Sequence, residues 1–377
     1  MQTSESLIFI FFLVYLLLHT LFATFIRPLL IDVDFFTVLQ FNLLEFRVST
    51  ISYFLPIIFM PLIVNTREKL ENFIILIIKI SIIFTIIEQL LSLSGFRGFF
   101  ENFYASSGVV SDNQIGAKSL GLYRIWSIVG SPQLLGVFHL VTLFYLLHKN
   151  ENKWAFLSLI AVIFSTSKTA YLILFLVSLL YLLYKKQYAI LFVSVIALIF
   201  ISIGTLNYYY YLIENISDKF PAFQKFIGSI LGYMTLLLNV EEESSPQAFI
   251  SGGPLYTLVG YYNNNILEII FGRGLTYSFM QDDLISSSEL GAFLYLTSDF
   301  YILTFFDQYG VIGVILLIYL FAIFPLIKIF RGESCLYFVP IIFFLSMFHY
   351  PPHIPKIMVL LSSYPLYVLY LRNTNDR

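Results

Sequence analysis

The chain of 377 residues is poor in charged residues and almost without cysteine. Only 12% of its residues are charged and 59% are hydrophobic, which excludes an ordinary soluble globular protein. Its single cysteine, Cys335, excludes an intrachain disulfide, so an extracytoplasmic loop would be held by packing alone. The net charge of −2 gives no reason to expect a nucleic-acid partner.

The sequence also lacks the motifs of several familiar enzyme classes. It contains no Walker loop, dinucleotide fingerprint, Cys/His metal cluster or Ser nucleophile elbow. No internal repeat of the inverted-repeat transporter kind is visible, and residues 1–6, without Lys or Arg, do not predict a cleavable signal. Any reaction would therefore use an already activated substrate, and we expect no cofactor.

Long apolar runs predict an all-α polytopic integral membrane protein. Because a helix needs roughly 20 residues to cross a bilayer, about ten spans are expected, some of them short or broken. They are 7–26, 48–64, 73–93, 125–147, 154–165, 170–184, 188–206, 300–327, 335–348 and 357–371. The expected organisation is a first transmembrane block at 1–206, a large polar-rich loop with interfacial helices at 207–299, and a C-terminal block at 300–377.

Basic residues indicate the orientation of these spans. Lys and Arg gather in the short turns and tails on one side, which is typical of cytoplasmic connections. These residues are Arg67, Lys69, Lys149, Lys153, Lys185, Lys186, Lys328, Arg331, Arg372 and Arg377. Both termini should therefore be cytoplasmic and the large loop should face outward. Arg27 and Arg47 oppose this arrangement, and an amphipathic helix at 35–46 in the outer interface would accommodate them.

The span at 125–147 begins with an arginine followed by helix-breaking residues. Arg124 precedes Gly130, Pro132 and Gly136, and a proline inside a helix removes a backbone donor and favours a kink. One interpretation is an anion-binding arginine above a broken helix. The other is an interfacial arginine at the end of a kinked packing helix.

The turn at 165–169 separates two spans with almost no loop. Ser167 or Thr169 would cap the next helix, and Lys168 would then stand at a helix N-terminus, where a cation is mildly unfavourable. An anion held by amides, hydroxyls and the ammonium would account for this charge. An ordinary polar turn at the membrane interface is the alternative.

Three further candidates lie in the outward connections. Arg273 stands between two glycines that permit a tight turn, and its planar fork suits phosphate, although a plain surface turn has the same pattern. Asp299, where the chain re-enters the membrane, and His349 could orient or deprotonate an acceptor hydroxyl. Asp299 could instead be a helix N-cap, and His349 a structural residue.

The large loop is rich in tyrosine and asparagine. Aromatic faces stack on sugars and amides bind their hydroxyls, so Tyr261, Tyr262 and Asn263 are candidate sugar ligands. Tyrosine is also enriched at membrane interfaces without any ligand.

Three polar residues inside expected spans each carry an expectation. Glu88 is an intramembrane carboxylate, which needs a partner or water and is a functional candidate for that reason. His139 is expected to hydrogen-bond between helices. On the same span as Glu88, Lys79 is expected to snorkel toward the cytoplasm.

The order of these segments resembles the O-antigen polymerase and ligase superfamily of bacterial envelope glycan assembly. Four segments are similar to its motifs: Arg124 with 130–133, the Ser167-Lys168-Thr169 turn, the Phe-Gly-Arg-Gly at 271–274, and Asp299 with Gly310 and Gly313. Lys168 stands where the family usually has arginine, which keeps the charge but loses bidentate geometry. Ligases typically carry a histidine near Asp299, and its absence here favours the polymerase branch.

The resemblance implies a GT-C-like membrane glycosyltransferase of the bacterial inner membrane with a periplasmic active site. Such enzymes join undecaprenyl-diphosphate-linked oligosaccharide repeat units and release undecaprenyl diphosphate. This reaction needs positively charged side chains near the leaving diphosphate, and it needs no metal ion in principle. Arg124, Ser167, Lys168 and Arg273 would bind the diphosphate, and Asp299 or His349 would serve the acceptor.

The resemblance also implies partners: lipid-linked glycan substrates, and a flippase and chain-length regulator of the same pathway. The alternatives are a ligase of the same superfamily, a lipid-linked oligosaccharide flippase, a metal-dependent transferase using Asp32 and Asp34, and a non-catalytic envelope scaffold.

Overall fold

The computed structural model of the chain describes residues 4–26, 51–106, 118–119, 121–190, 266–272, 301–348 and 358–363. These residues are mostly helical, and three helices are long and apolar enough to cross a membrane: Leu7–Ile26, Glu71–Tyr104 and Gln308–Phe330. Shorter apolar helices accompany them at Pro132–His148, Asn152–Phe164, Lys168–Tyr184 and Cys335–Ser346. The predicted helical class is therefore confirmed, the lengths of these three helices are consistent with a membrane protein, and the ten-span topology stays a prediction. The chain forms two compact units.

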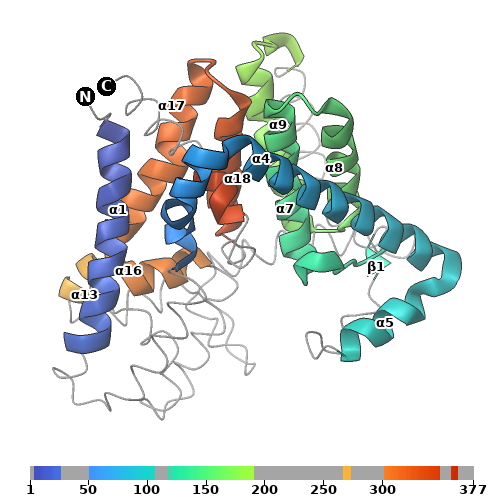
Figure 1. Ribbon diagram of the computed structural model, residues 1–377, viewed down its shortest axis with the longest axis horizontal. Helices are drawn as coiled ribbons and strands as arrows, with labels where there is room; N and C mark the ends of the chain where they lie inside the picture. Colours follow the sequence, from blue (N-terminus) through green and yellow to red (C-terminus); the bar gives the residue numbers. More distant parts are fainter. Residues whose placement is uncertain are drawn as a thin grey trace, which may run out of the picture. The chain divides into compact units, whose positions relative to one another are not determined.

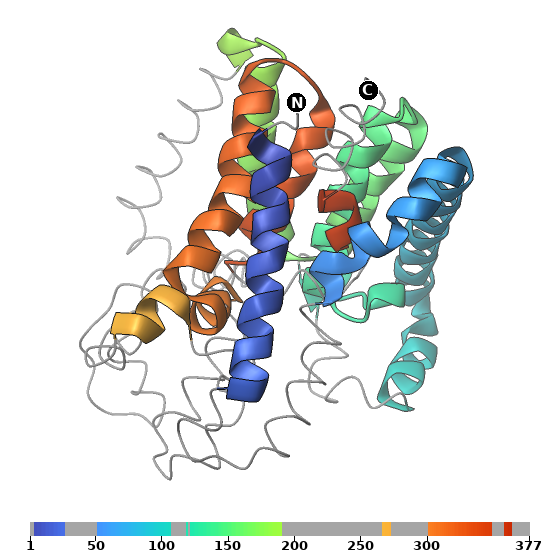
Figure 2. The same cartoon turned by 60° about the vertical axis from the view of Figure 1, so that its left-hand side comes forward.

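The first unit comprises Met1–Phe73, Leu236–Ile327 and Leu336–Arg377. Its described elements are α1 (Ser4–Leu21) with the π-helical turn η1 (Phe22–Ile26), the first part of α4 (Ile51–Leu91), α13 (Ile266–Phe271), α16 (Tyr301–Ile318), the π-helical turn η6 (Tyr319–Ile323), the first part of α17 (Phe324–Phe330), the last two residues of the 3₁₀ turn η7 (Cys335–Tyr337) and α18 (Phe338–Ser346). Helix α1 packs along α16, and α18 packs on η6 (Figures 1 and 2). Phe321 lies at the centre, with its ring 6.4 Å from that of Phe12 and 5.3 Å from that of Phe343.

The second unit comprises Ile74–Thr235 and Lys328–Cys335. It contains the second part of α4 (Ile51–Leu91), the π-helical turn η3 (Ser92–Phe96), α5 (Arg97–Ser106), the strands β1 (Lys118–Ser119) and β2 (Leu122–Tyr123), the 3₁₀ turn η4 (Ser127–Val129), α7 (Pro132–His148), α8 (Asn152–Phe164) and α9 (Lys168–Tyr184). The two strands form a short antiparallel hairpin in which Lys118 pairs with Tyr123.

Helix α7 is the core of this second unit. Its sequence is apolar on all sides, a pattern typical of a helix that is covered on all sides. It packs against α8 and against α9 (Figure 1), so its residues from Pro132 to Leu146 are buried with few exceptions.

One expected turn is absent. The sequence predicts two spans at 48–64 and 73–93 joined by a cytoplasmic turn with Arg67 and Lys69, but the structure has the single helix α4 from Ile51 to Leu91. Residues 65–72 are polar but contain no Gly or Pro, and Arg, Glu, Lys and Leu are good helix formers. Polarity alone was therefore insufficient to end the helix.

Other predicted spans agree with the structure or extend beyond its described part. The helices expected at 154–165 and 170–184 are α8 and α9, with bounds shifted by two residues or fewer at each end. Residues 188–190 and 358–363 are helical, while most of the spans expected at 188–206 and 357–371 lies outside the described residues. The amphipathic helix expected at 35–46 lies outside them entirely.

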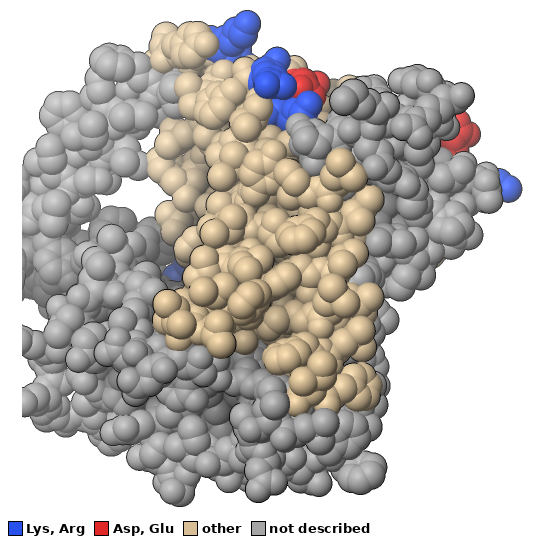
Figure 3. All heavy atoms as spheres, turned by 90° about the vertical axis from the view of Figure 1, so that its left-hand side faces the viewer, with Lys and Arg blue, Asp and Glu red and all other residues tan. Residues whose placement is uncertain are grey.

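The described surface is apolar over wide areas. On the side where α1 lies, most of it is uncharged, and charged side chains lie toward the edges of the view (Figure 3). Phe11 and Leu18 of α1 are exposed, and so is Phe25 of the π-helical turn η1 that continues the helix. Within the second unit, Lys79 contacts other side chains as well as solvent. Its ammonium pairs with Glu151 at 3.1 Å and lies 5.2 Å from the Trp154 ring centroid.

Candidate functional site

Helix α7 begins later than the sequence predicts, and Pro132 is the reason. The helix expected from residue 125 starts at Pro132, after Ser131 in extended conformation and Gly130 in the left-handed region at φ 82°. Proline is favoured at the first helical position because its missing N–H would have no intrahelical acceptor there. The expected kink at Pro132 is therefore wrong, and Arg124 lies on a non-helical segment between β2 and η4.

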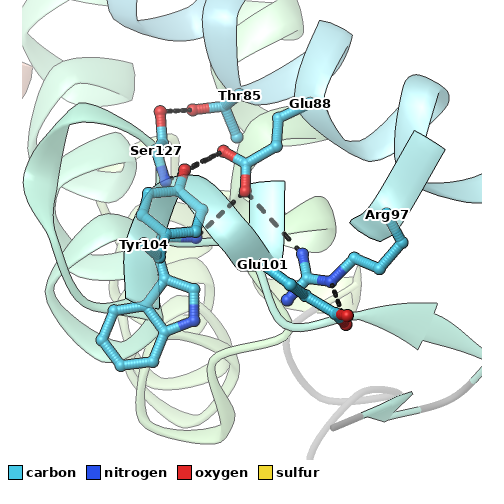
Figure 4. A network of polar contacts seen from close by, with 7 residues as sticks. Thr85, Glu88, Arg97, Glu101, Tyr104 and Ser127 are labelled. Carbon is cyan, nitrogen blue, oxygen red and sulfur yellow. Dashed lines mark hydrogen bonds and ion pairs between the residues drawn. The ribbon is translucent and has the colours of Figure 1, made fainter. Parts of the chain in front are cut away.

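Glu88 holds the backbone of this non-helical segment (Figure 4). The carboxylate is fully buried and accepts hydrogen bonds from the Ser127 N–H at 2.9 Å and the Trp126 N–H at 3.4 Å. The Tyr104 hydroxyl donates to the same carboxylate at 2.9 Å. Neither amide belongs to an α-helix, and Ser127 has a positive φ of 46°, so the side chain of Glu88 replaces acceptors that regular structure would supply.

Arg97 neutralises the buried carboxylate. Its Nη1 lies 3.9 Å from Glu88 Oε1, and its Nε donates to Glu101 Oε1 at 3.2 Å. The guanidinium also lies 5.2 Å from the ring centroid of Tyr123. Arg124 is thus flanked by Tyr123, which contacts Arg97, and by the Trp126–Ser127 amides, which contact Glu88. The expectation that Glu88 needs a partner is confirmed.

Hydroxyl groups extend this network to α7 and α8. Thr85 Oγ1 is hydrogen-bonded to Ser127 Oγ at 3.1 Å and to His139 Nε2 at 3.0 Å. Ser158 of α8 donates to the His139 carbonyl oxygen at 2.8 Å. His139 therefore links α4, α7 and α8, and the prediction that it hydrogen-bonds between helices is confirmed.

The turn before α9 packs on the start of α7. Ser167 caps α9 by accepting a hydrogen bond from the Ala170 N–H at 3.2 Å, which confirms one of the two predicted caps. Its hydroxyl also lies 3.5 Å from the carbonyl oxygen of Gln133. Gly136 faces the same turn, since an added Cβ would lie 2.6 Å from Ser165 Oγ and Ser167 Cβ. The structure thus brings the 131–136 and 165–170 segments together.

This contact predicts the effect of Gly136→Ala. The backbone of Gly136 is helical, so a methyl group adds no backbone strain, but it meets well-packed neighbours and should cost about 1–3 kcal/mol of unfolding free energy. Gly98→Ala on α5 is the matched control, because no atom lies within 4 Å of its added Cβ and alanine favours the helix. Unfolding of both variants in detergent by added dodecyl sulfate measures the difference. Equal stabilities would contradict the packing argument.

In the first unit, two motif glycines meet backbone to backbone. Gly272 follows α13, with φ 80°, and Gly310 interrupts α16, with φ 64° and ψ −170°. A Cβ added to Gly310 would lie 2.5 Å from Gly272 N, and one added to Gly272 would lie 2.5 Å from Gly310 N. The span expected at 300–327 is therefore broken at Gly310, and the break is where α13 ends.

Tyr15 of α1 binds both segments of the Gly272–Gly310 contact, called the junction below. Its hydroxyl donates to the Tyr309 carbonyl oxygen at 2.7 Å and, more weakly, to that of Phe271 at 3.2 Å. The His19 ring lies between the rings of Tyr15 and Tyr309, with centroid distances of 5.8 and 5.5 Å. A break in an apolar helix exposes carbonyl groups that need donors, and Tyr15 supplies one.

Several candidate residues lie outside the described part of the chain. These are Arg273, Asp299, His349, Tyr261, Tyr262, Asn263, Asp32 and Asp34. Of the remaining candidates, Arg124 and Lys168 are half-buried, Lys168 is the first residue of α9, and Ser167 is buried. Joint binding of a diphosphate by these residues stays a prediction.

Sequence reasoning missed Arg97, Tyr104 and Tyr15. Arg97 had a local signal, because it stands between Gly95 and Gly98 directly after an apolar run, where a chain reversal brings it back toward Glu88. Tyr15 lies within an uninterrupted apolar run and has no signal of its own.

Comparison with known proteins gives no assignment. No protein-family model matches the chain, and neither a curated protein nor a solved structure matches it significantly. Within the described ranges, no group of three or more His, Cys, Asp or Glu side chains could hold a metal ion.

Proposed function

We propose that the chain polymerises undecaprenyl-diphosphate-linked oligosaccharide repeat units at the periplasmic face of the bacterial inner membrane. The observation that best supports this proposal is the pairing of the four segments that carry the family resemblance. Segment 131–136 packs on the 165–170 turn, and Gly272 packs on Gly310. Segments that jointly form a site are expected to contact one another although they are distant in sequence.

In the proposed reaction, a hydroxyl of the incoming repeat unit attacks the anomeric carbon of the growing chain. The bond between that carbon and the diphosphate oxygen breaks, and undecaprenyl diphosphate leaves with the electron pair. The hydroxyl proton passes to Asp299 or His349. Since negative charge develops on the diphosphate, Arg124, Lys168 and Arg273 would stabilise the transition state more than the ground state.

The topology in this proposal is GT-C-like and polytopic, with cytoplasmic termini and the 207–299 loop in the periplasm. Tyr261, Tyr262 and Asn263 of that loop would bind sugar rings of the repeat unit. The Glu88 network contributes by holding the backbone after Arg124 through the Ser127 amide, and Arg97 of the same network contacts the ring of Tyr123 before it. The flippase would act before this step, and the chain-length regulator would act during it.

The test is deletion of the gene in its bacterium and complementation with variants, read out as the banding of lipopolysaccharide. Deletion should leave the core with a single repeat unit. Arg124→Ala and Arg273→Ala should lower the polymerisation rate on the order of 100-fold each, because each removes one charge-stabilising group. Arg331→Ala is the matched control, since this exposed arginine lies in an expected cytoplasmic turn and should restore the full ladder.

The same experiment separates the alternatives. Loss of every capped band, the single repeat included, would indicate a ligase or a flippase. Full ladders from normally expressed Arg124→Ala and Arg273→Ala variants would overturn the assigned diphosphate site. Purified protein that extends lipid-linked repeat units equally well in chelator would exclude a metal-dependent transferase.

A flippase is the second candidate that a specific observation favours. Glu88 and Arg97 form a buried ion pair within the apolar helical stretch Glu71–Tyr104, and charges inside the membrane often mark a translocation path. Vesicles containing the purified protein and a lipid-linked repeat unit distinguish the two functions. Translocation without elongation would establish the flippase, and elongation would support the polymerase.

A further inference from the structure

Helix α5 carries a stripe of exposed phenylalanines. Phe99 is 68% exposed and Phe103 is 59% exposed, and Phe96, just before the helix, is 61% exposed. The adjacent side is packed, because Phe100 and Tyr104 form a buried cluster with Trp126. Helix α5 thus uses one face for its own unit and presents another apolar face outward.

The remaining face of α5 is polar. At about 100° per residue, Glu101 projects to the side opposite the phenylalanine stripe, and Asn102 projects about 60° from Phe99 and about 100° from Phe103. Asn102 is exposed and Glu101 is half-exposed. A helix with a core face, an exposed apolar face and a polar face has the pattern of a helix lying in a membrane interface.

The length of the preceding helical stretch places α5 at such an interface. Residues Glu71–Tyr104 form an apolar stretch of 34 residues, which would extend roughly 51 Å if it were straight. The hydrocarbon core is about 30 Å thick, so about two fifths of the stretch must leave it or turn along its surface. Gly95, with φ 97°, breaks the helix at this point, and α5 turns away from the axis of α4 (Figure 1).

The exposed apolar surface is continuous across the break. On α4, Ile87 and Leu90 are half-exposed, and Leu93 continues this row into Phe96. If α4 crosses the bilayer, these side chains face lipid. The phenylalanine stripe extends that lipid-facing surface beyond the point where the span ends.

We propose that α5 lies in the plane of the membrane surface, with Phe96, Phe99 and Phe103 inserted at the boundary between headgroups and acyl chains. The partner surface is the phospholipid bilayer itself, and the proposal does not depend on the proposed function. Lipid contact on one face then fixes Arg97 and Tyr104 on the other face, where they complete the Glu88 network.

The test uses nitroxide labels at single cysteines in the full-length chain with Cys335→Ser, reconstituted in vesicles of phosphatidylethanolamine and phosphatidylglycerol. Labels replace Phe99 and Phe103 on the stripe, Asn102 on the polar face, and Leu90 on the span as a lipid-facing reference. Collision rates with oxygen, which concentrates in lipid, are compared with those of a water-soluble nickel chelate. Circular dichroism verifies that each labelled protein keeps its helix content.

The proposal predicts an order of lipid exposure. The ratio of oxygen to nickel collision rates should be highest at position 90, intermediate at 99 and 103, and lowest at 102. Equal ratios at 103 and 102 would mean that α5 lies in water, which overturns the proposal. Low rates with both reagents at 99 and 103 would mean that protein covers the stripe, which overturns it as well.

Discussion

Replacing Glu88 with alanine should lower the free energy of unfolding by about 3–5 kcal/mol, the cost of leaving a buried ion pair without one of its members. The change removes the carboxylate near Arg97 and the acceptor for Tyr104 and for the Trp126 and Ser127 amides. Each buried donor that loses its acceptor adds a desolvation penalty. The helices around the site should therefore unfold at a lower denaturant fraction.

The matched control is Glu101→Ala, which removes the second carboxylate that contacts Arg97. The Glu101 side chain is 37% exposed, and a pair of this kind contributes about 0–1 kcal/mol. Both variants are compared with the parent protein by titration of dodecyl sulfate into detergent micelles, with helix content as the readout. Similar losses for Glu88→Ala and Glu101→Ala would contradict the role assigned to burial.

A double variant tests whether Glu88 and Arg97 act as a pair. In the presence of Glu88→Met, the further change Arg97→Met removes a buried charge that has lost one of its two counter-ions. The double variant should therefore lose less stability than the sum of the two single losses, by about 0.5–3 kcal/mol. Additive losses would show that the two side chains are not coupled.

The features that the sequence predicted correctly depend on local rules. The end of α8 and the start of α9 follow from an apolar pattern interrupted by a capping serine, Ser167. The need of Glu88 and His139 for partners follows from the cost of burying a polar group. These predictions required no knowledge of which segments meet.

The features that were missed depend on long-range contacts. Pro132 satisfies the rule for a kink and the rule for a first helical residue, and only the neighbouring Gly130 and the acceptor at Glu88 select the second. Similarly, the α5 reversal at Gly95 places Arg97 and Tyr104 beside a residue on the preceding helix. The glycines on either side of Arg97 indicate a reversal, but nothing in the local pattern identifies Tyr104 as a partner of Glu88.

The junction of Gly272 and Gly310 was also beyond local reasoning. Gly272 was noted as permitting a tight turn, and Gly310 only as part of a segment similar to a family motif. That the two glycines serve one contact, with Tyr15 donating to both segments, depends on the packing of α1, α13 and α16. The candidate site residues Arg273 and Asp299 are adjacent in sequence to these elements, and their roles stay predictions.

Gly310→Ala should lower the free energy of unfolding by about 2–6 kcal/mol. Its φ of 64° and ψ of −170° lie in a region that is almost restricted to glycine, which contributes about 1–3 kcal/mol of strain. The added methyl group would also meet the backbone of Ile270 and Gly272, and overpacking of this kind contributes about 1–3 kcal/mol. Backbone atoms cannot rotate away as a flexible side chain can.

Gly332→Ala is the control that separates strain from collision. Gly332 has a comparable φ of 73°, but no atom lies within 4 Å of its added Cβ. Its cost should therefore be limited to backbone strain, about 1–2 kcal/mol for a left-handed residue that gains a Cβ. Unfolding by dodecyl sulfate and the yield of monodisperse protein measure both variants. Equal losses at positions 310 and 332 would contradict the collision between segments.

Gly272→Ala provides the decisive comparison, because its added Cβ would meet Gln308 and Gly310 from the other side of the same contact. Once either methyl group has separated the two segments, the second adds strain but little further collision. The double variant Gly272→Ala/Gly310→Ala should therefore lose less stability than the sum of the single losses. The same separation displaces the chain that leads into Arg273. Under the proposed function, both single variants should then lose polymerisation while Gly332→Ala keeps it.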